Sequence, residues 1–136
     1  MLKMNCRLPR IMLRVNKVVY GKNLKLLGYP FIFHYPEASI YIGDNCQINS
    51  NFFSNLGGLF QRTIIIAKGH GKIRIGNNVG ISGSTIYSLD SIEIGDNTVI
   101  GANTKIIDSD IHPIDPIARL KDDASCVETA PVKIGD

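Results

Sequence analysis

The sequence lacks tryptophan and is poor in other aromatic residues, which together make up 7% of its 136 residues. Its core must therefore consist mainly of aliphatic side chains. No stretch is apolar enough for a membrane-spanning helix, and charged residues interrupt the N-terminal apolar stretch where a signal peptide would need an unbroken core. Because the hydrophobic residues, 44% of the total, are spread along the whole chain, disorder is excluded and one folded domain is expected.

Cysteine is scarce, and its arrangement excludes a disulfide-stapled fold. Cys6, Cys46 and Cys126 stand singly, without any Cys-x-x-Cys pair, and an odd number cannot form a complete disulfide framework. Unpaired cysteines are typical of a reducing compartment. We therefore predict a cytoplasmic protein.

Acidic residues are absent from residues 1–25, although the net charge of the whole chain is only +3. Residues 1–20 thus form a basic lead-in segment, which could contact anionic lipid, a phosphorylated ligand or nucleic acid. A solvated segment is the favoured interpretation. We expect no nucleic-acid partner and at most a peripheral membrane contact through this segment. The basic residues of the N-terminal stretch are Lys3, Arg7, Arg10, Arg14, Lys17, Lys22 and Lys25.

What the sequence does contain is a repeat. The pattern aliphatic-x-Ile-Gly-Asp/Asn-Asn recurs in SIYIGDNCQI, KIRIGNNVGI and SIEIGDNTVI, and PVKIGD repeats its beginning. Aliphatic residues follow each other at intervals of six, which excludes the 3.6-residue period of an amphipathic helix and fits strand alternation. The Gly-Asp-Asn triplets supply turn residues. We therefore predict short strands wound around an axis, with stacked columns of buried isoleucines. These isoleucines are Ile42, Ile48, Ile75, Ile81, Ile94, Ile100 and Ile106.

The segments IGDNTVIGANTK and IGNNVGISGSTI resemble the hexapeptide repeat of left-handed parallel β-helix acyltransferases. The resemblance implies an all-β fold in which three hexapeptides form one triangular, left-handed coil, and it implies a homotrimer. We assign the β-helix to residues 21–136, with a first degenerate coil starting near Val18. Because PVKIGD breaks off inside a repeat, we expect a β-helix that is incomplete at its C-terminus.

The repeat spacings predict how the coils are distributed. Successive Ile-Gly pairs begin at Ile42, Ile75, Ile94 and Ile134, with spacings of 33, 19 and 40 residues. A triangular coil makes the second spacing one coil plus one residue. We interpret the first as two coils less three residues, irregular around SNFFSNLGGLFQRT, and the third as one coil carrying a long projecting loop, residues 109–131.

The exit into this loop carries the candidate chemistry. The next small position after Ile106 in the repeat is Asp110, and a carboxylate is unsuited to an aliphatic column, so the chain must leave the coil near there, with residues 108–115 as the root of the loop. The stretch DSDIHPIDPIARLK is similar to that of maltose-type acetyltransferases, which implies that His112 is a general base. It would remove the proton from a hydroxyl of a sugar or polysaccharide precursor that attacks acetyl-CoA.

The remaining candidates are weaker. Asp108 or Asp110 could orient the imidazole, and Ser82 could line the acceptor site, although a small corner residue is the favoured interpretation there. No residue is assigned to donor binding, because the coils that hold coenzyme A in the family lie beyond PVKIGD. His34 and His70 lack such a context, and isolated histidines do not predict a metal site. The alternative function is a non-catalytic or donor-site-deficient β-helix scaffold.

Overall fold

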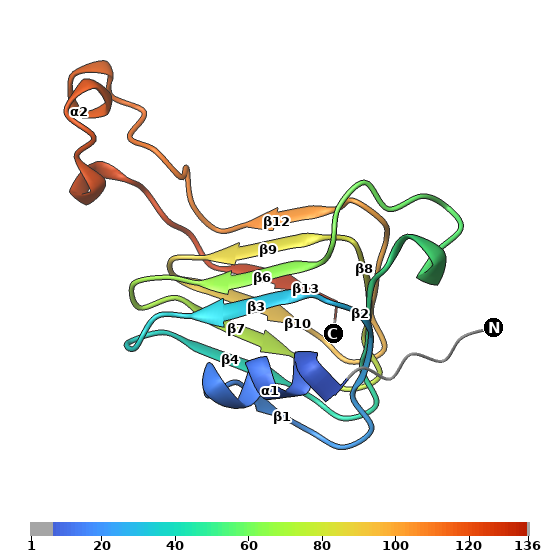
Figure 1. Cartoon of the computed structure of the whole chain (residues 1–136). Coiled ribbons are helices and arrows are strands. Elements are labelled where there is room, and N and C mark those ends of the chain that lie inside the picture. The colour runs from blue at the N-terminus through green and yellow to red at the C-terminus, as the bar shows by residue number, and fades with distance from the viewer. Residues whose placement is uncertain (1–6, 136) are drawn as a thin grey trace.

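Figure 1 shows the computed structural model of the chain, which describes residues 7–135. Its strands lie in three sheets, and neighbouring strands within each sheet are parallel. Sheet 1 contains β1 (Val19–Tyr20), β4 (Ser39–Ile42), β7 (Lys72–Ile75), β10 (Ser91–Ile94) and β13 (Val132–Ile134). Sheet 2 contains β2 (Lys25–Gly28), β5 (Gln47–Ser50), β8 (Gly80–Ser82) and β11 (Val99–Ile100). Sheet 3 contains β3 (Phe31–His34), β6 (Ile64–Ala67), β9 (Thr85–Ser88) and β12 (Lys105–Ile107).

The chain visits the three sheets in turn, and each strand pairs with the strand one coil further along. The fold is therefore predominantly β, with parallel strands stacked in three sheets, and this arrangement is consistent with a β-helix solenoid. The prediction of a parallel β fold is confirmed at this level. Between successive coils, equivalent residues lie side by side, as Ile42, Ile75 and Ile94 do in sheet 1.

Stacked aliphatic side chains fill the interior. All seven isoleucines predicted to be buried are at most 6% exposed. Their columns continue through Leu26, Ile48 and Ile81 in sheet 2 and through Ile65 and Ile86 in sheet 3. Because one coil alone could not bury these side chains, stacking of the coils is what removes them from water.

The Gly-Asp-Asn triplets form the turns between sheets 1 and 2, as predicted. Asn45, Asn78 and Asn97 have φ values of 57°, 57° and 58°, a conformation that asparagine tolerates better than most residues. Their side-chain amides form a ladder, with Nδ2 of Asn45 donating to Oδ1 of Asn78 at 3.3 Å and Nδ2 of Asn78 donating to Oδ1 of Asn97 at 3.0 Å. The turns therefore bond to one another and hold the coils in register.

One predicted coil count is wrong. Ile42 pairs directly with Ile75, so the 33-residue spacing is one coil with an insertion rather than two shortened coils. The insertion is residues 51–63, which we name the aromatic loop; it joins β5 to β6 and contains the short 3-10 helix η1 (Phe52–Ser54). An insertion at a corner lengthens the chain without changing the strand register. The 40-residue spacing is one coil with a long loop, as predicted, because Ile94 pairs with Ile134.

The helix α1 (Arg7–Val15) lies against the first coil. Leu13 is fully buried with the core, and Asn16 donates its side-chain amide to the carbonyl of Ile32 at 2.9 Å. Strand pairing begins at Val19, so the predicted degenerate first coil consists of β1, β2 and β3. Within the described residues, no helix is both long and apolar enough to cross a membrane.

Two loops leave this body at opposite ends of the sheet 3 strands. The aromatic loop precedes β6, and residues 109–131, which we name the exit loop, follow β12. Figure 1 shows both projecting beyond the stacked strands, the aromatic loop in green and the exit loop in orange and red. The exit loop contains the helix α2 (Pro116–Leu120) and the 3-10 helix η2 (Ala124–Cys126).

Candidate functional site

The exit loop begins from a buried carboxylate. Ala67 and Ser88 are paired, fully buried residues at the ends of β6 and β9, and Asp108 follows β12 beside Ser88. The Asp108 carboxylate accepts the hydroxyl of Ser88 at 2.6 Å and the backbone N–H groups of Leu89 at 2.8 Å and Asp90 at 2.9 Å. Three donors offset the desolvation of this buried charge. Asp108 thus joins the end of β12 to the turn that follows β9 in the preceding coil.

Backbone hydrogen bonds close the root of the exit loop. The carbonyl of Asp108 accepts from Ala130 at 2.9 Å, the N–H of Asp110 donates to Glu128 at 3.1 Å, and Ser109 forms an antiparallel bridge with Thr129. The two ends of the long loop are therefore tied together. Asp110 itself is exposed, and the chain leaves the coil after Asp108, where the predicted loop of residues 109–131 begins.

His112 follows a strained turn. The N–H of His112 donates to the carbonyl of Asp110 at 2.6 Å, and the central residue, Ile111, has φ of 64°. A γ-turn with positive φ is the rare, strained form, and a β-branched residue fits it poorly. The imidazole is exposed, whereas Pro113 behind it is buried. The turn therefore fixes the backbone that displays His112 to solvent.

The outer part of the exit loop is ordered by capping carboxylates. Asp115 accepts the N–H of Ala118 at 2.8 Å and caps α2, which has Pro116 in its first turn. Asp123 accepts the hydroxyl of Ser125 at 2.6 Å and its N–H at 3.1 Å, and these bonds hold the pKa of the Asp123 carboxyl below its ordinary value. These capping bonds fold the outer part of the exit loop.

The structure brings only some of the predicted site residues together. Asp110 and His112 share the root of the loop, but the Asp108 carboxylate faces Ser88 and the turn that follows it. Among residues 7–135, none hydrogen-bonds to the imidazole of His112. Ser82 lies in β8 of sheet 2, where its buried hydroxyl accepts the side-chain amide of Asn49 at 3.0 Å. This contact joins Ser82 to the neighbouring strand β5.

The two remaining histidines occupy other coils. His34 ends β3, where its Nδ1 lies 2.8 Å from the carbonyl of Tyr35, and His70 is exposed in the turn after β6. In the part of the chain that the structure describes, no group of three or more His, Cys, Asp or Glu side chains is placed to hold a metal ion.

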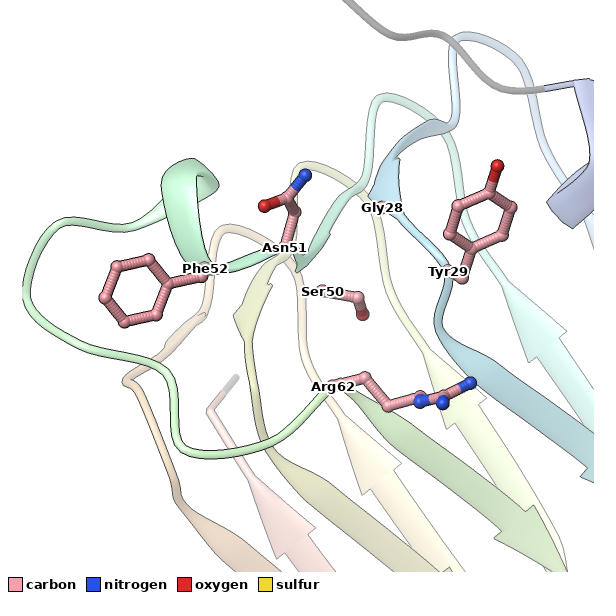
Figure 2. A pocket seen from close by; sticks show the side chains of 6 residues that line it. All are labelled: Gly28, Tyr29, Ser50, Asn51, Phe52 and Arg62. Atoms are coloured by element: carbon pink, nitrogen blue, oxygen red, sulfur yellow. The ribbon is translucent and has the colours of Figure 1, made fainter.

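Sequence reasoning missed three features of the surface and core. Ser109 has a buried hydroxyl without a hydrogen-bond partner among the described residues, directly at the root of the exit loop. An open pocket of about 370 Å³ lies where the aromatic loop meets β2, with Arg62 in its wall. Figure 2 shows the Arg62 side chain extending toward Tyr29, while the ring of Phe52 extends away from Arg62.

The third feature is in the core. Burial raises the pKa of the Cys46 thiol, which makes this thiol inert at neutral pH.

In comparisons with known proteins, no family model, no curated protein and no solved structure gives a significant match to the chain.

Proposed function

We propose that the chain is a coenzyme A-dependent O-acetyltransferase with His112 as its general base. Acetyl would pass from acetyl-CoA to a hydroxyl of a sugar or polysaccharide precursor, and the coils would wind left-handed, as in the acyltransferase family that the repeat resembles. The supporting observation is an exposed imidazole in the loop that follows β12, the last strand of sheet 3, on a root that is held by Asp108 and contains the Ile111 turn.

The proposed reaction requires few functional groups from the protein. Imidazole titrates near neutrality, so His112 can take the proton of an acceptor hydroxyl while the oxygen attacks the thioester carbonyl. The tetrahedral intermediate collapses with loss of the coenzyme A thiolate, which receives the proton from the imidazolium. No covalent acyl-enzyme forms, and Cys126 is therefore not required as a nucleophile although it lies exposed in the same loop.

A homotrimer is part of the same proposal. Within the described part of one chain, no side chain or backbone group hydrogen-bonds to the imidazole of His112, so a neighbouring copy would have to supply the groups that orient it. The outer face of sheet 3 supports such a contact, because one of its two outward rows is wholly apolar, whereas the other ends in Thr85 and Lys105. Its paired outward residues include Phe33, Ile66, Tyr87 and Ile107.

The proposal is tested by measuring free thiol released from acetyl-CoA in the presence of a panel of sugars. His112→Ala should lower kcat on the order of 10²–10⁴-fold, the usual effect of removing a general base. Cys126→Ala changes another exposed residue of the same loop and should retain the wild-type rate. Equal rates for His112→Ala and wild type would refute the base assignment. A wild-type chain without turnover on any sugar would instead favour the scaffold function.

A further inference from the structure

The aromatic loop displays four large apolar side chains to solvent. Phe52, Phe53, Leu56 and Phe60 are 65%, 80%, 89% and 94% exposed. The rings of Phe52 and Phe53 touch each other edge to face, with centroids 5.5 Å apart. Single exposed apolar residues are common, but four within nine residues of one projecting loop indicate a surface that binds something.

These side chains are exposed although the loop itself is folded. Asn51 accepts the N–H of Phe53 at 3.0 Å and starts η1, and Asn103 in the neighbouring corner accepts the N–H of Phe60 at 3.0 Å and donates to the carbonyl of Gly58 at 3.1 Å. Leu59 points inward and packs on Gly83. One apolar residue thus anchors the loop while its neighbours face out, so the exposure belongs to the folded state.

The surroundings of the aromatic loop carry positive charge only. Residues 45–89 contain no acidic residue, and the basic side chain closest in sequence to the exposed apolar residues is Arg62, at the base of the loop. Arg62 lines the open pocket together with Ser50 and Asn51. An exposed aromatic tip above a cationic, polar pocket is complementary to a bilayer, whose apolar interior lies beneath phosphate groups.

The exit loop provides an internal comparison. It also exposes large apolar side chains, with Ile117 at 65% and Leu120 at 90%. Residues 109–131, however, hold five acidic and two basic residues. A negatively charged loop is repelled by an anionic membrane surface, so apolar exposure alone would not bring it there.

We propose that the aromatic loop is a lipid-docking element that inserts Phe52, Phe53, Leu56 and Phe60 into the surface of a bilayer containing anionic phospholipid. Arg62, in the pocket below, meets the lipid phosphate. The side chains reach only the interface, as an amphipathic anchor does, and nothing crosses the membrane. This contact is independent of acetyl transfer, and it uses the loop between β5 and β6 and not the helix α1.

The absence of tryptophan makes a direct test possible. Phe60→Trp introduces the only indole of the chain at the tip of the aromatic loop, and Leu120→Trp introduces it at a comparably exposed position of the exit loop. Vesicles of equimolar phosphatidylglycerol and phosphatidylcholine are added to each variant. The emission of Phe60→Trp should shift to the blue and be quenched by brominated lipid, while that of Leu120→Trp should stay unchanged.

Sedimentation with the same vesicles measures the affinity. The variant Phe52→Ser/Phe53→Ser/Phe60→Ser should bind at least about tenfold more weakly than wild type, because it removes most of the inserted apolar surface. The matched change Ile114→Ser/Ile117→Ser/Leu120→Ser should bind like wild type. Arg62→Gln should lower binding a few-fold on anionic vesicles and leave binding to pure phosphatidylcholine unchanged.

Three outcomes would overturn the proposal. If the emission wavelength of Phe60→Trp does not change when vesicles are added, the loop does not insert. Equal shifts in both tryptophan variants would show non-specific adsorption. A blue shift of Phe60→Trp that grows with protein concentration in the absence of lipid would show that a second copy of the chain covers the loop.

Discussion

Ile111 is the residue where backbone strain lies next to the candidate chemistry. Its φ of 64° is unfavourable for a β-branched side chain by about 1–3 kcal/mol, and the hydrogen bonds of the loop root hold it there. Strain of this kind collects at functional sites, and here it immediately precedes His112. We therefore regard the turn as the feature that positions the imidazole.

The first prediction concerns this strain. Ile111→Gly should raise the free energy of unfolding by about 0.5–1 kcal/mol, because the relief of strain exceeds the entropy that glycine adds to the unfolded chain. Ile114→Gly is the matched control, since Ile114 is an exposed residue of the same loop without positive φ. It should lower stability by a similar amount. Urea denaturation measures both, and destabilisation by Ile111→Gly would contradict the strained turn.

Single residues also show what a sequence can reveal about backbone geometry. Asn45, Asn78 and Asn97 were predictable as turns because asparagine tolerates positive φ and recurs at one position of the repeat. Ile111 was not predictable, because its type argues against the conformation that the loop root imposes. His112 could be proposed as a candidate because of the motif around it. The hydrogen bond between Asp108 and Ser88 could not be predicted, because it depends on the pairing of β9 with β12.

At the scale of elements, the exit loop depends on Asp108. Asp108→Ala would leave the N–H groups of Leu89 and Asp90 without their acceptor, and would leave the Ser88 hydroxyl with only the carbonyl of Lys72, at 3.4 Å. Unpaired buried donors are costly, so we expect a loss of about 2–4 kcal/mol in the free energy of unfolding. Asp110→Ala removes an exposed carboxylate two residues away and should cost less than about 0.5 kcal/mol.

Urea denaturation of the two variants checks this prediction, and a double variant sharpens it. In Asp108→Ala/Ser88→Ala the hydroxyl that has lost its shorter hydrogen bond is removed as well, so part of the lost stability should return relative to the sum of the single changes. Strictly additive effects would mean that the 2.6 Å bond between Ser88 and Asp108 contributes nothing measurable.

The two loops illustrate why one insertion was predictable and the other was not. Residues 109–131 carry no repeat, so their projection could be predicted from the loss of the pattern. The aromatic loop lengthens the spacing from Ile42 to Ile75 to 33 residues, close to the length of two coils, so counting repeats treated the loop as part of an irregular coil. Only the direct pairing of Ile42 with Ile75 distinguishes the two possibilities.

For the whole molecule, the three outer faces differ in chemistry. The outward column of sheet 1 runs through Tyr41, Arg74, Glu93 and Lys133, with the Arg74 guanidinium 5.2 Å from the centre of the Tyr41 ring. Sheet 2 presents polar or small residues such as Gln47 and Gly80. Sheet 3 presents one wholly apolar row, Phe33, Ile66, Tyr87 and Ile107, beside a second row that ends in Thr85 and Lys105. Only sheet 3 therefore has a face whose burial against another copy would be favourable.

This difference predicts where the proposed trimer forms. Ile66→Lys places a charge in the middle of the outer face of sheet 3, and Val19→Lys places one on the outer face of sheet 1, where Val19 pairs with Tyr41. Burying an unpaired ammonium costs several kcal/mol, enough to separate copies that meet at sheet 3. Light scattering at micromolar concentration should therefore give a trimer for wild type and Val19→Lys, and a monomer for Ile66→Lys. Circular dichroism should be the same for all three, since both substitutions lie outside the core. A wild-type monomer would exclude the assembly, whereas a trimer of Ile66→Lys would place the contact on another face.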